Sequence, residues 1–362
     1  MPAPASKLLD LQKIMWNGSI PLEIRLAASD CRTYDDSEAY LVQPPRLSYT
    51  AFLLPRLYAF FRESLIDPDV AAHEAWLSFQ DVPLKWHYPL GLLYDLFSGA
   101  EPVSIDKYGK DSLAASQIPA EPTSADQPLP WRLVVHFTDY PGDQLIQLDP
   151  EGRALLDSYI NAVKEADFIR NGTARTVMSL SKEDSDNLWR AVQTRKSCYS
   201  KQNRPSFQLQ GTRMLTSLIL DNLSLFNTIH TKLLNPPGQD LRHIPLKIYL
   251  PTAVSAAATI MATAPQALTA DSIPEEGPTK QIGHIRVVQS LIPLLLPSKQ
   301  PQTLGTALNS ILPTIFPSRR NPLLAQPVLH GVVIPMAAPI EDLGRAAAYA
   351  DGFLHVAIVM LA

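Results

Sequence analysis

The chain has 362 residues, of which 46% are hydrophobic and 18% charged, and its formal net charge is −4 at pH 7. This composition predicts a folded protein of two or three modules and excludes a chain that is disordered throughout. The net charge is slightly negative, which excludes an overall positive field that would attract nucleic acid. The two cysteines cannot by themselves form a disulfide framework or a metal site. The first residues lack the features of a signal peptide, and every long apolar run is broken by proline or polar residues, so we expect a cytoplasmic protein.

A helix is predicted before residue 17, because Ser6 can cap it and Asn17-Gly18 ends it. Its apolar stripe at helical spacing consists of Leu8, Leu11, Ile14 and Met15. Residues 20–26 (IPLEIRL) follow, and positions 22–26 alternate apolar and charged side chains, which is typical of a half-buried strand. Pro21 indicates either the beginning of that strand or the edge of a sheet.

The same strand pattern returns at residues 244–250 (IPLKIYL). A helical pattern follows each copy, at 48–61 and 303–312, and a β-rich run closes each block, at 131–137 and 353–360. Two opening strands, a helix and two later strands give the order ββαββ, which is the order of a ubiquitin-like β-grasp module. The repeat indicates a duplicated domain, and a chance similarity of two short strands is the alternative.

Helical spacing at 151–168, 182–192 and 215–234 predicts a helical domain between the two blocks. Ser181, with Asp184 three residues later, resembles a capping pair at the start of the second of these helices. Three segments lack apolar periodicity and are interpreted as inserts, at about 101–130, 196–213 and 253–282. The predicted organisation is a helix at 1–17, a first ubiquitin-like module at 18–141, a helix-rich domain at 142–238 and a second ubiquitin-like module at 239–362.

Catalytic and cofactor motifs are not found in the sequence. It has no glycine-rich phosphate loop, no Gly-x-Ser-x-Gly turn and no histidine pair at metal-binding spacing. His87 and His136 are interpreted as satisfied core or edge histidines, and Trp86 and Trp131 as core anchors. No catalytic residue, cofactor or metal is therefore expected, and a hydrolase would need convergent polar and titratable groups that the sequence does not indicate.

Lys164 has distinctive surroundings on the predicted helix at 151–168. It lies off the apolar face, with Ile160 and Phe168 one turn to either side. The apolar face comprises Leu155, Leu156, Tyr159, Ala162, Val163 and Ala166. An exposed lysine framed by apolar neighbours suits attack on a thioester that another protein presents. An ordinary solvated helix lysine is the alternative.

Six stretches together resemble the autophagy protein 5 family, and they occur in the family's order. They are 16–24 (WNGSIPLEI), 84–95 (LKWHYPLGLLYD), 129–137 (LPWRLVVHF), 177–181 (VMSLS), 242–248 (RHIPLKI) and 351–358 (DGFLHVAI). The resemblance implies an α+β fold in which two ubiquitin-like β-grasp modules flank a helix-rich domain, with an N-terminal helix. It also implies a protein that is not itself an enzyme but the non-catalytic subunit of an E3-like conjugate.

The resemblance to fungal members assigns Lys164, upstream of Asn171-Gly172, as the acceptor of the ubiquitin-like autophagy protein 12 through an isopeptide bond. The conjugate is implied to promote transfer of a second ubiquitin-like protein from an E2-like enzyme to phosphatidylethanolamine, peripherally on pre-autophagosomal membranes. Family members also bind the coiled-coil autophagy protein 16. Leu8, Leu11 and Met15 either contribute to that contact or dock the first helix on the first module.

One departure from the family is the insert at 196–213, which falls where the family has nearly continuous helix. It is either an extruded loop or extra sequence retained in the chain. An interaction adaptor that uses its ubiquitin-like modules without being modified is the competing function.

Overall fold

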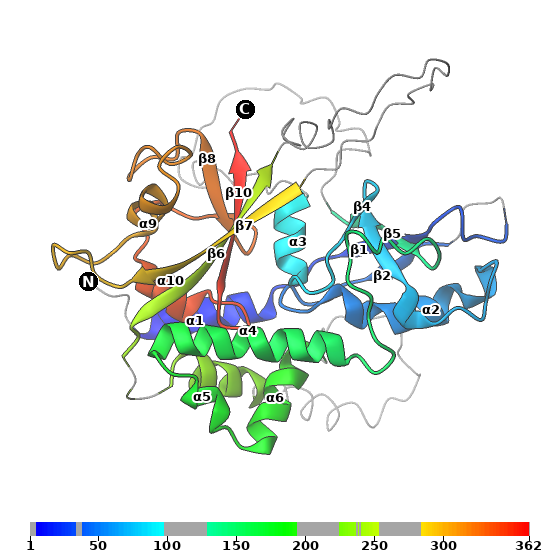
Figure 1. Cartoon of the computed structure of the whole chain (residues 1–362), viewed down its shortest axis with the longest axis horizontal. Coiled ribbons are helices and arrows are strands. Elements are labelled where there is room, and N and C mark those ends of the chain that lie inside the picture. Colours follow the sequence, from blue (N-terminus) through cyan, green and yellow to red (C-terminus); the bar gives the residue numbers. More distant parts are fainter. Residues whose placement is uncertain are drawn as a thin grey trace, which may run out of the picture.

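The computed structural model describes residues 5–33, 38–97, 129–193, 224–236, 238, 240–252 and 284–361. The three predicted inserts, apart from residues 129 and 130, and the first part of the helix predicted at 215–234 lie outside these residues. Two β-sheets stand side by side, and a group of helices runs beneath them (Figure 1). Of the described helices, none is long and apolar enough to cross a lipid bilayer.

The first sheet follows helix α1 (Ala5–Asn17) and has the strand order β2-β1-β5-β3-β4. Its strands are β1 (Leu22–Leu26), β2 (Tyr40–Val42), β3 (Trp76–Phe79), β4 (Val82–Pro83) and β5 (Trp131–His136). Its helices are α2 (Leu54–Phe61) and α3 (Leu90–Phe97), with short 3₁₀ turns at Thr50–Leu53, Arg62–Ser64 and Ala72–Glu74. Strand β1 starts directly after Pro21 and lies inside the sheet, so this proline marks the strand's beginning.

The second sheet repeats this topology in the order β7-β6-β10-β8-β9. Its strands are β6 (His243–Thr252), β7 (His284–Pro293), β8 (Ala325–Leu329), β9 (Val332–Val333) and β10 (Leu354–Met360). Its helices are α9 (Leu304–Ile311) and α10 (Ile340–Ala346). The two similar strand patterns form β1 and β6, which hold equivalent places, each paired in parallel with the last strand of its sheet. This equivalence favours duplication over chance similarity.

Each module is larger than the predicted ββαββ order. Both sheets contain five strands, and a second short helix precedes the last strand, α3 in the first module and α10 in the second. The short strands β4 and β9 have only two residues each, which is too short for an alternating pattern to be recognised in the sequence. The predicted pattern therefore identified the central strands but missed these peripheral elements.

The helices beneath the sheets are α4 (Arg153–Asn171), α5 (Arg175–Met178), α6 (Lys182–Gln193) and a π-type helix at Thr228–Leu234. The predicted capping pair of α6 is confirmed, because Ser181 Oγ accepts the Asp184 backbone N–H at 3.0 Å and donates to the Asp184 carboxylate. Helix α4 packs on β6 of the second sheet. One face of β6 contacts α10, where Ile244 lies against Gly344, and α4 covers the other face.

A buried arginine at the end of α4 joins the helices to the second module. Arg170 is fully buried, and its guanidinium donates to the carbonyl oxygens of Leu234 at 2.6 Å, Gly344 at 3.2 Å and Gly352 at 3.4 Å. These carbonyls belong to the π-type helix, to α10 and to the turn before β10. One side chain therefore holds three segments that are distant in sequence.

A second buried group joins the two ubiquitin-like modules. Asp95, on α3 of the first module, forms an ion pair with Arg46 and accepts the backbone N–H of Gly331 of the second module at 2.9 Å. Burial raises the pKa of Asp95, and Arg46 and the Gly331 N–H partly oppose this. Because Gly331 has a φ of +81°, a glycine suits the turn that presents its N–H to the carboxylate.

We expect Arg170→Met to lower the stability of the whole assembly. The substitution leaves three buried carbonyl oxygens without their side-chain donor, which costs about 3–5 kcal/mol and lowers the apparent Tm by about 10 °C. Differential scanning fluorimetry measures this shift. Arg153→Met on the same helix is the control, because among the described residues the exposed Arg153 side chain pairs with Glu151 alone, and its loss should change Tm by less than about 2 °C. Equal Tm values for both variants would contradict the assignment.

Candidate functional site

Helix α4 is a rigid platform because both of its ends are fixed. At the start, the Asp149 carboxylate accepts the backbone N–H groups of Arg153 and Ala154 at 2.8 and 2.7 Å. The same hydrogen bonds lower the pKa of Asp149. At the end, Gly172 has a φ of +74°, and its N–H donates to the Phe168 carbonyl at 2.7 Å, which is a common way for a helix to end.

Lys164 lies near the middle of α4 on its exposed side. Leu155, Tyr159, Val163 and Ala166 of the predicted apolar face are buried, whereas Lys164 is exposed. Ile160 is half-buried and Phe168 is 58% exposed, so apolar surface lies one turn to either side of the lysine. Lys164 forms no ion pair with any other described residue.

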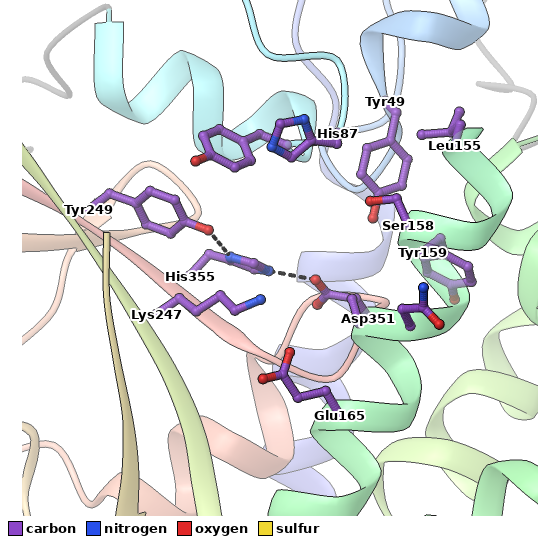
Figure 2. A pocket seen from close by; sticks show the side chains of 13 residues that line it. Tyr49, His87, Leu155, Ser158, Tyr159, Glu165, Lys247, Tyr249, Asp351 and His355 are labelled. Atoms are coloured by element: carbon purple, nitrogen blue, oxygen red, sulfur yellow. Dashed lines mark hydrogen bonds and ion pairs between the residues drawn. The ribbon is translucent and has the colours of Figure 1, made fainter. Parts of the chain in front are cut away.

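A cavity of about 340 Å³ opens beside this surface, between α4, the second sheet and the first module (Figure 2). Helix α4 lines it with residues that include Asn161 and Glu165, which neighbour Lys164 along the helix. The other walls come from the second module and from the first module: Lys247, Tyr249, Asp351 and His355, and Tyr49, His87 and Tyr88. The cavity is therefore built by all three parts of the chain.

The floor of the cavity is a chain of hydrogen bonds. His355 Nε2 lies 2.7 Å from Asp351 Oδ2, and His355 Nδ1 lies 2.8 Å from the Tyr249 hydroxyl (Figure 2). Burial alone would raise the pKa of Asp351, but the His355 charge and hydrogen bond, with Lys247, lower it overall. Burial raises the pKa of Tyr249 well above its usual value. The carboxylate is therefore ionised and the phenol protonated at neutral pH.

Lys247 and Glu165, which also line the cavity, have partners of their own. Lys247 Nζ lies 3.8 Å from the centre of the Phe353 ring, in a cation–π contact. Glu165 accepts a hydrogen bond at 2.6 Å from Gln289 of the edge strand β7. His87 lies at the wall contributed by the first module, where burial, then the charges of Lys85 and Lys247, lower its pKa to about 4. His87 is therefore a neutral imidazole at physiological pH.

This arrangement is a poor match for hydrolytic chemistry. His355 binds Asp351 through one ring nitrogen and the Tyr249 hydroxyl through the other, and burial raises the pKa of that hydroxyl well above its usual value, so the hydroxyl is a poor nucleophile. Ser158 lines the cavity, but no hydrogen bond joins it to His355 among the described contacts. The cavity does gather the convergent titratable groups that the sequence did not indicate. Their geometry favours a shaped recognition surface.

The three residues predicted on the first helix lie on α1 with different exposures. Leu11 is 44% exposed, whereas Leu8 and Met15 are half-buried. Helix α1 packs mainly against α10 of the second module, where Gln12 Nε2 donates to the Arg345 carbonyl at 2.9 Å. Trp16 is buried with its ring against Phe226. The helix thus docks chiefly on the second module, and docking on the first, one of the two alternatives, is not its main contact.

The cavity residues were missed in the sequence although they lie in stretches that carry the family resemblance. His87 and Tyr88 belong to 84–95, and Asp351 and His355 belong to 351–358. Asp351 and His355 are four residues apart, and side chains at that spacing in a continuous strand do not touch. A turn at Gly352 brings them together, so their contact could not be recognised in the sequence. The interpretation of His136 holds, since its Nε2 lies 2.8 Å from Ser78 Oγ and its ring stacks on Trp76.

Two five-stranded sheets of equal topology around a helical group define a protein with two ubiquitin-like modules flanking a helical region. Comparison with protein families identifies the same three parts in the same order. Residues 15–137 match "Autophagy protein ATG5, UblA domain", 152–200 match its alpha-helical bundle region, and 243–358 match its UblB domain. The chain belongs to the autophagy protein 5 family. The fold class that the sequence predicted is thereby confirmed.

Fungal relatives match the chain over nearly its full length. Autophagy protein 5 of Phaeosphaeria nodorum is 48% identical, with 97% of each chain covered. Autophagy protein 5 of Aspergillus oryzae is 44% identical, with 98% of each chain covered. The crystal structure of Kluyveromyces marxianus Atg5 superposes with a TM-score of 0.59 at 18% identity, covering 97% of this chain and 99% of that one, which shows a shared fold.

We expect the stability of the protein to depend on His87 below neutral pH. The pKa of His87 is about 4 in the folded state against an ordinary 6.5, so the unfolded state binds more protons between these values. The stability that neutral His87 contributes is therefore present above pH 6.5 and is lost as the pH falls toward 4. In His87→Gln, the decrease in the free energy of unfolding over this pH range should be smaller by up to about 3 kcal/mol.

Apparent Tm values of the wild type and of His87→Gln, recorded from pH 7.5 down to pH 4.5 or so, test this prediction. His73→Gln is the matched control, because His73 is half-buried outside the cavity. A wild-type pH dependence that His87→Gln leaves unchanged would show that another group is responsible.

Proposed function

We propose that this protein is a conjugation scaffold of autophagy that accepts the ubiquitin-like autophagy protein 12 on Lys164. The observation that carries the proposal is the position of Lys164. It is exposed in the middle of a helix fixed at both ends, is framed by Ile160 and Phe168, and forms no ion pair with the described residues. A partner can therefore reach the amine without first breaking a salt bridge.

The reaction at Lys164 is an acyl transfer. The lysine ammonium loses a proton, and the neutral Nζ attacks the carbonyl carbon of a thioester that joins the modifier's C-terminal glycine to an E2-like enzyme. A C–N bond forms, the C–S bond breaks, the thiolate leaves, and the amine's second proton passes to a base or to water. Contact of a partner with Ile160 and Phe168 would remove water from the amine and favour its deprotonated form.

The conjugate then acts in an E3-like manner. It promotes transfer of a second ubiquitin-like protein from its E2-like enzyme to the amine of phosphatidylethanolamine, peripherally at pre-autophagosomal membranes. This chain contributes binding surfaces and no catalytic group of its own. The cavity beside Lys164 supports that role, because hydrogen bonds fix the side chains of Asp351, His355 and Tyr249 on its floor.

The alternative is an adaptor that uses the same modules without becoming modified. The two functions differ only at the amine of Lys164, so a substitution that keeps the charge separates them. Arginine retains the charge of lysine but cannot form the isopeptide bond.

We expect Lys164→Arg to abolish the conjugate. Purified chain, autophagy protein 12 and its activating and E2-like enzymes are combined with ATP, and a denaturing gel resolves the conjugate as a slower band. The band should be lost completely in Lys164→Arg, because no amine remains at the acceptor position.

Lys182→Arg is the matched control for this gel, because Lys182 is an exposed lysine at the start of α6 in the same group of helices. It should conjugate like the wild type. A band that persists in Lys164→Arg would move the acceptor to another lysine. The absence of any band from folded wild type with competent enzymes would favour the adaptor.

We further propose that α1 contributes to binding of the coiled-coil autophagy protein 16, through the stripe of Leu8, Leu11 and Met15. Gln12 and Trp16 hold the helix on the protein, which leaves Leu11 exposed for a partner. Half-buried Leu8 and Met15 lie at helical spacing to either side of Leu11, at i−3 and i+4.

Leu11→Asp is expected to weaken binding of an autophagy protein 16 coiled-coil peptide at least tenfold or so, because a charge replaces an apolar contact. Isothermal titration calorimetry gives the Kd. Leu9→Asp is the matched control, since Leu9 is similarly exposed but lies on another side of the helix. Loss of binding in Leu9→Asp alone would place the contact on that other side.

A further inference from the structure

Strand β7 is a long open edge of the second sheet. It pairs with β6 along its whole length, from His284 to Pro293, and no other described strand lies on its outer side. Edge strands of natural proteins are usually protected by short length, charged side chains, proline or bulges. Strand β7 has ten residues, and residues 287–292 (VVQSLI) contain no charge and no proline. This edge is therefore suited to accept a further strand.

One face of the edge lies against α4, next to Lys164. Gln289 Nε2 donates to Glu165 Oε1 at 2.6 Å, and Glu165 directly follows Lys164 in the sequence. Figure 2 shows Glu165 extending from α4 toward the second sheet. Because side chains alternate along a strand, Val287 and Leu291 share the face of Gln289, and they are 41% and 55% exposed. We call Val287, Gln289 and Leu291 the β7 rim.

The exposed surface continues from the β7 rim across α4 to Lys164. The side chain of Lys164 leaves the helix about 100° from that of Glu165, and Phe168, which is 58% exposed, lies between these two directions. On a helix with a diameter of about 11 Å, this angle spans about 10 Å of surface, which about three extended residues can cross. The amine of Lys164 is therefore within reach of a chain that leaves the β7 rim.

We propose that the β7 rim binds the extended C-terminal segment of the modifier as an added strand, from which the terminal glycine reaches Lys164. The inference deepens the proposed function and rests on it for the identity of the modifier. The thioester carbonyl must reach the cysteine of the E2-like enzyme and the lysine amine at the same time, which requires a segment that projects from the folded part of the modifier. An extended segment of this kind adds to a sheet edge through backbone hydrogen bonds.

The side chains around the β7 rim favour an uncharged segment. Glu165 is held by Gln289, and Lys247, which is opposite Gln289 on β6, is engaged in a cation–π contact. Arg286 points to the other face of the sheet, because neighbouring residues of a strand alternate. The rim itself offers two apolar side chains and one amide. A segment with apolar side chains at alternate positions matches this surface.

Binding of a peptide tests the added strand. The probe is a fluorescent peptide that carries the last residues of the modifier and ends in its terminal glycine, and anisotropy is measured as full-length chain is added. Methylation of a peptide nitrogen removes one backbone donor. Methylation at successive positions should therefore weaken binding with a period of two residues, by about tenfold at alternate positions. Val287→Ser with Leu291→Ser should weaken binding of the unmethylated peptide by about tenfold.

Leu41→Ser with Val332→Ser is the matched control. Leu41 of β2 and Val332 of β9 are 58% and 50% exposed, and each lies in an outer strand of its sheet. This variant should bind the peptide like the wild type, and both double variants should keep Tm within about 2 °C because the four side chains are exposed. Equal losses in the two double variants, or methylation effects without a period of two, would overturn the proposal.

Single-turnover conjugation tests delivery of the glycine to Lys164. The thioester between the modifier and its E2-like enzyme is formed first, and transfer to the full-length chain is followed on a denaturing gel. The variant with Val287→Ser and Leu291→Ser should accept the modifier about tenfold more slowly than the wild type. The control variant should react at the wild-type rate. Peptide binding at the β7 rim with equal transfer rates in all three chains would overturn delivery by this strand.

The two assays separate failure of this inference from failure of the proposed function. A wild type that is conjugated at Lys164 without binding the peptide keeps the proposed function and overturns the role of the β7 rim. A wild type that binds the peptide with the period of two but is never conjugated overturns the proposed function and not the added strand. Self-association that the β7-rim variant abolishes in sedimentation, without peptide binding, would replace the modifier by a second copy of the chain.

Discussion

The packing of the helices against the second module depends on the buried guanidinium of Arg170. It donates to carbonyl oxygens of the π-type helix, of α10 and of the turn before β10, and the Arg170 backbone carbonyl accepts the Arg242 N–H at 2.7 Å where the second module begins. Burial lowers the pKa of Arg170 to about 10, with the charge of Arg345 acting in the same direction, so it remains a cation at neutral pH. A buried cation is costly unless it is hydrogen-bonded, and these carbonyls bind its two terminal nitrogens only when the three segments are folded together.

Because Arg170 fixes α4 on the second sheet, it also determines the surroundings of Lys164. The cavity forms only if α4 lies over β6 and β10 while Tyr49, His87 and Tyr88 approach from the first module. The approach of the first module is set in turn by Asp95, which binds Arg46 of its own module and the Gly331 N–H of the other. Two buried charges thus position a surface that contains neither of them.

The sequence predicted the parts with strong local patterns and missed those that depend on distant contacts. The alternation of β1 and β6 and the apolar face around Val163 were recognisable, because one buried face imposes a fixed period on a strand or helix. The exposure of Lys164 followed from the same periodicity, whereas its proposed role as acceptor rests on the family resemblance and not on any local signal.

The cavity was not predictable in the same way. Asp351 and His355 meet through a turn, and they face residues of α4 and of the first module that lie more than a hundred residues away in sequence. No pattern within a short stretch of sequence indicates contacts between residues so far apart along the chain. The buried cation of Arg170 was equally hidden, because an arginine in the last turn of a helix normally suggests solvent exposure and interaction with the helix dipole.

The parallel pairing of each module's first and last strands has a consequence for how the chain acquires its structure during synthesis. β1 can complete its sheet once β5 has emerged, so the first module can close early. β6 must wait for β10, whose residues Leu354–Met360 occupy the middle of the second sheet. Until β10 has been synthesised, the edge of β6 that pairs with it has no partner strand. Pairing between strands so far apart in sequence forms slowly. The protein therefore most needs protection from aggregation while its second module is being synthesised.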